Sequence, residues 1–422
     1  MTTARPGWSS WKVVAASGIG MGFGTTTLVT YTPGVFFSDL ARDIGLTRTQ
    51  FGTGYLGTTL ALALGIPVVG WVVDRAGVRN TVLAGAMLLA LGFFLLGTLA
   101  VSPWSYITLM TLVGILGAGA SPVGYTRAVT VTFERGRGTA LGICMTVVGI
   151  AAAFLPQIAA VSIAHFGWHG GYVVLGVIAL MTIPFSFLWL RIPSGEPPSE
   201  RSSPPVAAVV NEVATADRPT AFFRSAVFWI LLAGFALVAL SFFGFMVHLV
   251  PLVERAGVGK HQAVQYASVL GISGLLSRLV AGAISDLVHA PWIMVVAAAL
   301  VAANLLLISG GDPHLFWLLA CTLGFVVGAE VDLLSFLTAR YFPGRMYGRV
   351  YAWIYSPTIL ASGLSSVWIG ACADRFGDYS ISLKIAAAAG ALGGLLFLLL
   401  PAYQRVNHGI GRSVRAFSGG ES

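Results

Sequence analysis

The chain has 422 residues, of which 56% are hydrophobic and only 9% are charged, and its mean hydropathy is +0.85. This composition excludes an ordinary soluble domain and indicates an integral membrane protein. The net charge of +8 would suggest nucleic acid as a partner of a soluble protein, but in a membrane protein basic residues act as topological signals and lipid contacts, so no nucleic-acid binding is expected.

Apolar runs along the chain are long enough to cross a hydrocarbon core of ~30 Å. Six come first, at 13–37, 51–73, 81–100, 106–133, 139–163 and 171–190. A polar, proline-containing segment follows and is interpreted as a solvated linker. Six more runs lie at 226–250, 263–287, 292–309, 315–342, 347–372 and 381–400. We therefore expect an all-α membrane protein with twelve transmembrane helices, organised as an N-terminal six-helix half (1–190), a cytoplasmic linker (191–224) and a C-terminal half with a short cytoplasmic tail (225–422).

The basic residues are distributed unevenly between the two sides of this layout. If both termini are cytoplasmic, sixteen of the 24 Lys and Arg residues lie in cytoplasmic segments and six in the outside loops. The remaining two, Arg127 and Arg278, lie inside apolar runs. Because cytoplasmic loops of membrane proteins are enriched in Lys and Arg, we expect a multi-pass protein of the cell (inner) membrane with both termini cytoplasmic.

Arg278 lies near the middle of the run 263–287. A central Arg costs roughly 2.5 to 3.5 kcal/mol on insertion scales, so its side chain should face a partner or a water-filled cavity. A guanidinium group binds a carboxylate through two parallel hydrogen bonds, which makes an organic anion the natural ligand. The alternative is a structural Arg paired with a carboxylate of its own chain.

Several residues recur at a nearly constant offset at equivalent helix ends of the two halves, which indicates two six-helix pseudo-repeats with a substrate site between them. The recurring pairs are Gly70 with Gly282, Asp74 with Asp286, Gly138 with Gly348, Phe166 with Phe376, and Gly167 with Gly377. A further glycine run, Gly18, Gly20, Gly22 and Gly24, predicts a loosely wound or closely approached first helix.

The segment GWVVDRAGVRN resembles the loop between helices two and three of the major facilitator superfamily. The resemblance rests on five residues, namely Gly70, Asp74, Arg75, Gly77 and Arg79. It implies the major facilitator fold, and it implies that these residues form a conformational latch at the cytoplasmic face.

A second motif, F-x-R-x-R-x-x-A-x-G-x-x-M, is similar to the signature of the monocarboxylate transporters and their oxalate:formate relatives. It is formed by Phe133, Arg135, Arg137, Ala140, Gly142 and Met145. Arg278 matches that family's substrate-binding Arg on helix eight. The chain departs from the family where it has Gly274 in place of an Asp, Tyr31 in place of a Lys, and only Arg349 as a cation in 347–372. A single central cation favours a single carboxylate over a dianion, and the family's Asp and Lys proton relay does not carry over.

Polar residues in the helices expected to line the cavity are candidates to complete the site. His248 could bond a carboxylate or carry a proton, since imidazole titrates near neutral pH; alternatively it caps backbone or headgroups at the membrane surface. Tyr31, Tyr125 and Tyr355 each offer a hydroxyl to a substrate carboxylate, although each is also compatible with simple packing.

Glu330 and Asp332 lie two residues apart in the run 315–342, about 200° apart on a helix, so both cannot face the same line of the cavity. They are candidates for proton coupling. Arg127 is a candidate gate residue, which we expect to pair with Glu330 or Asp332 across the halves when the cytoplasmic side is closed. The alternative is an Arg127 that extends to the inner headgroups.

These observations predict a secondary active transporter of small monocarboxylates, similar to lactate or pyruvate, that works as a proton-coupled symporter by alternating access. An organic anion exchanger or an exporter of amphipathic compounds on the same fold is the alternative. We expect no enzyme activity, cofactor or metal site, because no nucleophile, ligand cluster or nucleotide loop is recognisable. The expected partners are the small organic anion, a proton and the lipid bilayer, with a monomer as the functional unit.

Overall fold

The computed structural model describes residues 8–133, 137–190, 221–285, 288–309, 315–342 and 347–401, and within these ranges every regular element is a helix. The first expected span is broken into three helices, α1 (Trp8–Gly22), α2 (Thr25–Tyr31) and α3 (Pro33–Ile44). A Cβ at Gly24 would lie 2.5 Å from the carbonyl oxygens of Ala120 and Gly20, so only glycine fits at the first break. The prediction of a loosely wound, closely approached segment is therefore confirmed.

Local capping signals start the next helices of the N-terminal half. Thr47 with Gln50, and Ser102 with Ser105, form reciprocal capping boxes at the starts of α4 and α6. The elements are α4 (Arg48–Ala76), α5 (Val78–Leu99), α6 (Pro103–Gly117), η1 (Ala118–Ala120), α7 (Pro122–Thr132) and α8 (Arg137–Trp189). Inside α8 the backbone turns at Gly167, where φ is 67° and ψ is 175°, so this long element comprises two passes.

The C-terminal half repeats this plan. Its elements are η2 (Ala221–Arg224), α9 (Ala226–Phe242), α10 (Gly244–Arg255), α11 (Lys260–Ser285), α12 (Pro291–Ile308), α13 (Phe316–Tyr341), α14 (Tyr347–Phe376), α15 (Ser380–Leu396) and η5 (Phe397–Leu399). Gly377 has a φ of 79° and follows α14, so it is the counterpart of Gly167 in the first half. Both glycines hold a backbone conformation that residues with a Cβ rarely adopt, which explains why the pair recurs in the sequence.

The expectation of twelve membrane passes is confirmed. Nine segments of the described chain have the length and hydropathy of a membrane span. One of them, α8, contains two passes, and α11 and α14, with 26 and 30 residues, complete the twelve. The boundaries differ mainly where single expected spans are broken into α1 to α3, α6 with α7, and α9 with α10. Most of the expected linker, 191–220, lies outside the described residues.

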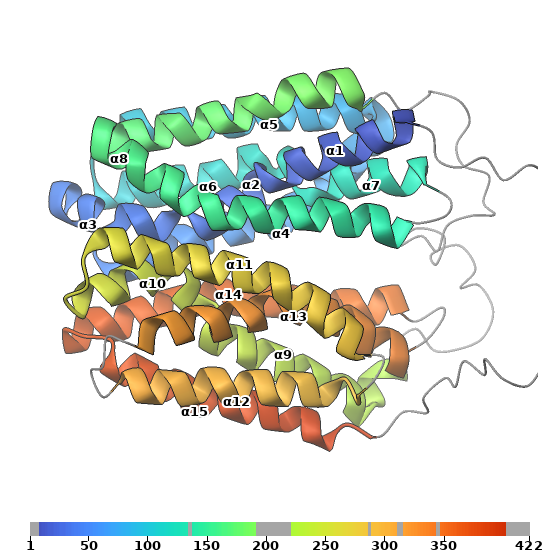
Figure 1. Cartoon of the computed structure of the whole chain (residues 1–422), viewed down its shortest axis with the longest axis vertical. Coiled ribbons are helices and arrows are strands. Elements are labelled where there is room, and N and C mark those ends of the chain that lie inside the picture. Colours follow the sequence, from blue (N-terminus) through green and yellow to red (C-terminus); the bar gives the residue numbers. More distant parts are fainter. Residues whose placement is uncertain are drawn as a thin grey trace, which may run out of the picture.

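The helices form two groups that lie side by side, α1 to α8 in one and α9 to α15 in the other (Figure 1). The groups contact each other through α4 with α14, α8 with α11, and α10 with α2 and α3. We call the end of the molecule where α1 begins at Trp8 and η5 ends at Leu399 the terminal end. The opposite end, where α3 ends at Ile44 and α4 begins at Arg48, is called the far end.

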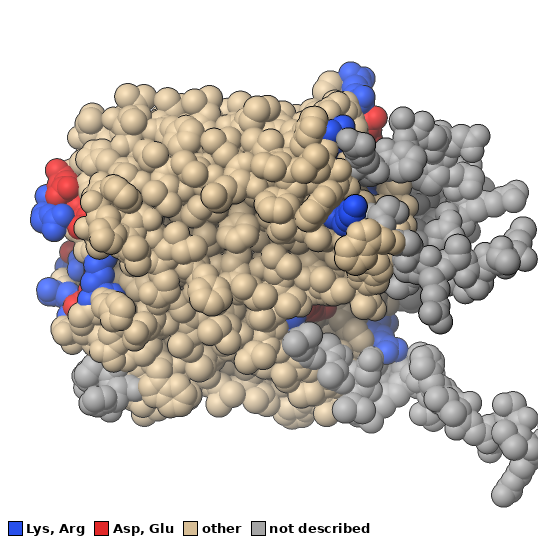
Figure 2. Space-filling view, turned by 45° about the horizontal axis from the view of Figure 1, so that its top comes forward, with Lys and Arg blue, Asp and Glu red and all other residues tan. Residues whose placement is uncertain are grey.

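Large apolar side chains cover the outer surface of the helices. Leu64, Trp104 and Met181 are between 62% and 75% exposed, which a soluble protein would not tolerate over such a wide area. Figure 2 shows that Lys, Arg, Asp and Glu on the visible face gather at the two ends and leave a wide uncharged band between them. This distribution fits a multi-pass protein whose band contacts lipid.

Candidate functional site

Arg278 lies on α11 at the boundary between the two groups of helices. Its Nη1 lies 3.5 Å from Asp332 Oδ1 on α13 and 3.9 Å from Met145 Sδ on α8, so residues of both halves reach it. The Arg278 and Asp332 side chains are 27% and 43% exposed. A partly exposed ion pair of this length leaves much of the guanidinium fork available to a second carboxylate.

The two acidic residues of α13 occupy different environments, as their spacing on the helix predicts. Asp332 faces Arg278, whereas Glu330 is only 2% exposed and its Oε1 has no hydrogen-bond partner among the described residues. Glu330 nevertheless lies within electrostatic range of both Arg278 and Asp332. Among the described residues, the site therefore contains the cation Arg278 and the carboxyl groups of Glu330 and Asp332, and Asp332 forms the ion pair with Arg278 in this conformation.

Two of the candidate tyrosines reach the same site from opposite halves. Tyr31 at the end of α2 and Tyr355 on α14 both lie within electrostatic range of Arg278, and Tyr355 also lies within range of Glu330. Both side chains are partly buried. Tyr31 on α2 and Tyr355 on α14 thus lie in the neighbourhood of Arg278, which is paired with Asp332.

Tyr125 and His248 are placed elsewhere. The ring of Tyr125 packs against Gly20 of α1, and its buried hydroxyl points towards Ser186 and Thr182 at the end of α8, so its described contacts stay within the N-terminal half. Sequence alone could not exclude this outcome, because it does not specify which face of α7 meets α1 and α8.

His248 is fully buried in α10 and contacts α14 and the turn before α15. Its Nδ1 is 3.2 Å from the Tyr379 hydroxyl, and its Nε2 is 2.9 Å from the Ser366 carbonyl oxygen. The edge of Phe51 on α4 completes its surroundings. Both ring nitrogens already have partners, and these partners belong to the junction of the halves towards the far end. A role of His248 in binding substrate or carrying a proton stays a prediction, and in this conformation its described contacts are not at Arg278.

A row of three tyrosines on α14 was not anticipated. Tyr347, Tyr351 and Tyr355 are four residues apart, and successive ring centroids are 5.8 and 5.4 Å apart. The repeated spacing Y-x-x-x-Y-x-x-x-Y puts all three on one helix face and is the sequence signal that could have revealed the row. Tyr347 also lines a cavity of about 330 Å³ together with Asp332 and Phe336 of α13.

The residues of the expected cytoplasmic latch lie at the terminal end, where α4 turns into α5. Asp74 accepts a hydrogen bond from Arg127 of α7. Arg79 Nη2 donates to the Phe187 carbonyl oxygen at 2.7 Å, and Arg75 lies 3.9 Å from the centre of the Trp71 ring. Gly77 has a φ of 79° and makes the turn, and a Cβ at Gly70 would meet no atom within 4 Å. All these contacts are within the N-terminal half.

The Arg127 pairing expected for a gate therefore differs from the one in this conformation. Arg127 bonds Asp74 of its own half, and pairing with Glu330 or Asp332 stays a prediction for a conformation in which the terminal end is closed. Sequence reasoning had Asp74 and Arg127 as separate candidates and did not connect them.

Polar contacts join the two halves at the far end. Asp374 of α14 accepts hydrogen bonds from the Arg48 and Thr49 backbone N–H groups, at 3.1 and 2.7 Å, and from Thr49 Oγ1 at 2.7 Å. Lys260 at the start of α11 forms an ion pair with Asp39 of α3. The far end is thus held closed in this conformation by groups from both halves.

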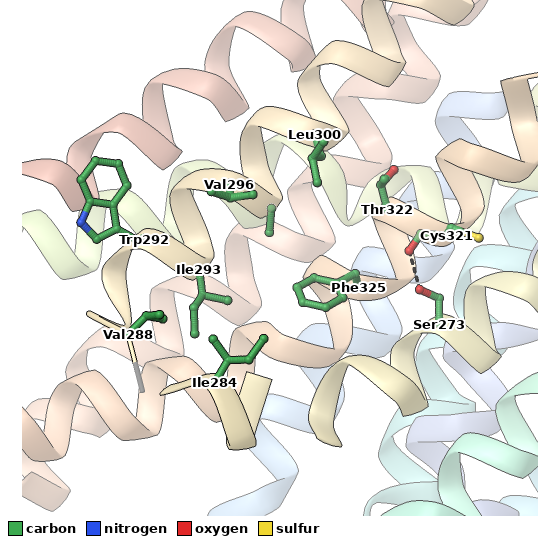
Figure 3. A pocket seen from close by; sticks show the side chains of 11 residues that line it. Ser273, Ile284, Val288, Trp292, Ile293, Val296, Leu300, Cys321, Thr322 and Phe325 are labelled. Carbon is green, nitrogen blue, oxygen red and sulfur yellow. Dashed lines mark hydrogen bonds between the residues drawn. The ribbon is translucent and has the colours of Figure 1, made fainter. Parts of the chain in front are cut away.

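A larger cavity, of about 680 Å³, lies between α11, α12 and α13 (Figure 3). Its lining is apolar apart from Thr322, Cys321 and Ser273, and the Ser273 hydroxyl donates to the Cys321 carbonyl oxygen. Trp292, which also lines it, is 52% exposed on the outer surface. The described lining residues of this cavity carry no charge.

The family model of the Major Facilitator Superfamily matches residues 19–356. The chain belongs to this superfamily. It is 27% identical over 417 residues to human monocarboxylate transporter 11, covering 94% of this chain and 83% of that protein. It is 24% identical over 295 residues to monocarboxylate transporter 2 of Mesocricetus auratus, covering 66% of this chain and 59% of that protein. The resemblance to the monocarboxylate transporters is therefore confirmed, and the protein is a membrane transporter of the major facilitator type.

Solved structures support the fold. A bacterial homologue of the human lysosomal transporter Spinster, inward-facing and occupied, has a TM-score of 0.71 at 15% identity and covers 94% of this chain and 97% of its own. A D-xylose-proton symporter has the same TM-score and identity, with coverage of 92% and 96%. At this identity the likeness concerns the fold alone, and it confirms the predicted major facilitator architecture.

Proposed function

We propose that this protein is a proton-coupled symporter of monocarboxylates and that Arg278 binds the substrate carboxylate. The observation that carries this proposal is the Arg278–Asp332 pair, which is 3.5 Å long, partly exposed and reached from both halves. An incoming carboxylate can take the place of Asp332 on the guanidinium through two shorter hydrogen bonds. Tyr31 and Tyr355, which lie within electrostatic range of Arg278, complete the hydrogen bonding of the substrate carboxylate in this proposal.

Proton coupling follows from the same exchange of partners. Once the substrate occupies Arg278, Asp332 lies beside an anion and has lost its counter-ion, so a proton on Asp332 restores the balance of charge. The loaded site then carries one substrate anion and one proton more than the empty site, which makes transport electroneutral. Glu330, buried within electrostatic range of the pair, is the alternative proton acceptor. His248 has no part in this step, because its ring nitrogens are bonded to Tyr379 and Ser366.

Alternating access requires two sets of contacts that form in turn. The far-end contacts of Asp374 and Lys260 close one side, while the Asp74–Arg127 pair lies within one half at the other. We assign the terminal end to the cytoplasm of an inner-membrane protein, so that this conformation is inward-facing and the loop from Gly70 to Arg79 acts as the latch of the outward-facing one. A single chain contains the whole pathway, so a monomer is the proposed functional unit.

Uptake into proteoliposomes tests the proposal. Radiolabelled pyruvate and lactate are supplied with and without an inward proton gradient, to the parent protein and to Arg278→Lys, Asp332→Asn and Arg42→Lys. The gradient should accelerate uptake by the parent. Arg278→Lys should reduce uptake at least tenfold, because an ammonium group does not reproduce the planar fork.

Asp332→Asn should retain substrate exchange but lose the response to the gradient, because an amide cannot carry the proton. Arg42→Lys is the matched control, since Arg42 is exposed at the far end and bonds only Asp39 and Asp43 among the described residues. If neither acid enters in any condition, or if Arg278→Lys behaves like Arg42→Lys, the assignment of Arg278 to a substrate carboxylate is wrong.

A further inference from the structure

The tyrosine row of α14 lies beside the Arg278 pair and runs from it towards the terminal end. Tyr355 is within electrostatic range of Arg278, and Tyr351 is within range of Glu330 and Asp332. Tyr347 is the outermost member and lines the cavity of about 330 Å³ in which Asp332 is also exposed. The row therefore extends from the neighbourhood of Arg278, near Tyr355, to the cavity that Tyr347 lines.

A second aromatic ring lines this cavity. Phe336 lies on α13 one turn after Asp332 and lines the cavity with Tyr347. A ring that enters the cavity can pack against the rings of Phe336 and Tyr347. Aromatic pairs gain free energy beyond area burial when their centroids are roughly 4.5 to 7 Å apart, which is the range found within the row itself.

The volume of the cavity exceeds what a three-carbon acid needs. Pockets that enclose drug-sized ligands begin at roughly 300 Å³, and this cavity of about 330 Å³ adjoins the Arg278 pair through Asp332. A pyruvate molecule bound at Arg278 would make no contact with the rings of Phe336 and Tyr347. A carboxylate that carries an aromatic ring would contact both Arg278 and these two rings.

From this juxtaposition we propose that the preferred substrates are monocarboxylates with an aromatic ring, such as aryl-substituted 2-oxo acids. Arg278 binds the carboxylate, and Tyr347 with Phe336 binds the ring. This inference rests on the proposed function and adds to it the class of the substrate tail. Tyr347, the member of the row that lines the cavity, is the specificity-determining residue.

The test compares initial uptake rates of radiolabelled phenylpyruvate and pyruvate over a range of concentrations in proteoliposomes. The parent protein should have a KM for phenylpyruvate at least tenfold below that for pyruvate. Tyr347→Leu should raise the phenylpyruvate KM about tenfold, equivalent to about 1.4 kcal/mol, and change the pyruvate KM less than about twofold. Tyr347→Phe keeps the ring and should retain the preference.

Tyr266→Leu is the matched control, because Tyr266 is a half-buried tyrosine of α11 whose hydroxyl bonds Gln262 and whose ring lies near Phe316, outside the row. It should leave the ratio of the two KM values unchanged. The ratio does not depend on how much variant protein folds, so partial misfolding of Tyr347→Leu does not affect the result.

Either of two results would overturn the inference while leaving monocarboxylate transport in place. One is a parent protein that takes up pyruvate with a KM equal to or below that of phenylpyruvate. The other is a Tyr347→Leu variant that changes both KM values alike. If neither acid is transported, the proposed function is wrong, and the proposed preference for aromatic substrates is wrong as well.

Discussion

Replacing Asp374 by alanine removes a carboxylate that joins the two halves at the far end. Asp374 accepts hydrogen bonds from the Arg48 and Thr49 N–H groups and from the Thr49 hydroxyl, and its Oδ1 lies 3.6 Å from Arg48 Nη1. The acceptor belongs to α14 and the donors belong to the first turn of α4, where N–H groups have no partner within the helix. We expect Asp374→Ala to destabilise the conformation in which the far end is closed.

The size of the effect follows from the three hydrogen bonds. At about 1 kcal/mol net for each bond the loss is about 3 kcal/mol. The ion pair adds little, because the Arg48 and Asp374 side chains are 22% and 25% exposed and water screens them. A change of 3 kcal/mol shifts a two-state equilibrium about 150-fold. A far-end-open state populated at about 1% would therefore become the major one, at about 60%.

Double electron–electron resonance measures this shift directly. Spin labels at Val101→Cys and His261→Cys, both exposed at the far end and in different halves, report the distance between the halves. The labelled background carries alanine in place of the three native cysteines, Cys144, Cys321 and Cys372. In nanodiscs Asp374→Ala should gain a population at longer distance.

Asp378→Ala is the control, because Asp378 caps the N–H of Ser380 in its own half at 2.9 Å. It should retain the distance distribution of the parent. The reasoning is refuted if Asp374→Ala keeps the parent distribution, or if Asp378→Ala produces the same long-distance population as Asp374→Ala.

Two further predictions concern stability at the ends of the helices. Gly77→Ala places a Cβ on a residue whose φ is 79°, and the strain should lower the free energy of unfolding by about 1 to 3 kcal/mol. Gly142→Ala is the control, because a Cβ at Gly142 in α8 would meet no atom within 4 Å, and this variant should be neutral or stabilising. Thermal unfolding in detergent compares the two variants, and equal melting temperatures would contradict the strain argument. The Arg42 guanidinium, and then the Trp168 indole N–H, lower the pKa of Asp43 below its ordinary value of 3.8. A lowered pKa means that Asp43 contributes stability above that value and loses it as the pH falls through the folded-state pKa. Asp43→Asn should therefore flatten the dependence of melting temperature on pH below about pH 4. An unchanged slope would show that the Asp43 carboxylate does not contribute to the pH dependence of stability.

The candidate site was only partly predictable from sequence. Arg278 stands out because a cation in an apolar run is costly wherever the helix lies, so its importance does not depend on knowing its neighbours. Tyr31 and Tyr355 were chosen on the same basis as Tyr125 and His248, namely as polar groups on expected cavity helices. Which of these four residues lie near Arg278 depends on which face of each helix meets which neighbour, and a single sequence does not encode that in any local pattern.

The far-end contacts and the tyrosine row were missed for different reasons. The row has a local signal, the spacing of four on one helix, which simply was not used. Asp374 and Arg48 are 326 residues apart in sequence, and neither is unusual at a helix end, so nothing local connects them. The same holds for Asp74 and Arg127, which belong to different helices of one half.

The sequence by itself determined that the protein crosses the membrane twelve times, that the crossings form two repeats, and that Arg278 lies near the middle of an apolar run. These features can be read from the sequence because each membrane-spanning segment must be long enough and apolar enough to cross the hydrocarbon core of the bilayer, whatever its neighbours are. Only the tertiary structure decided which groups meet. Arg278 meets Met145 from 133 residues away, and Asp332 rather than Glu330 faces the cavity, because these contacts depend on the rotation and packing of whole helices.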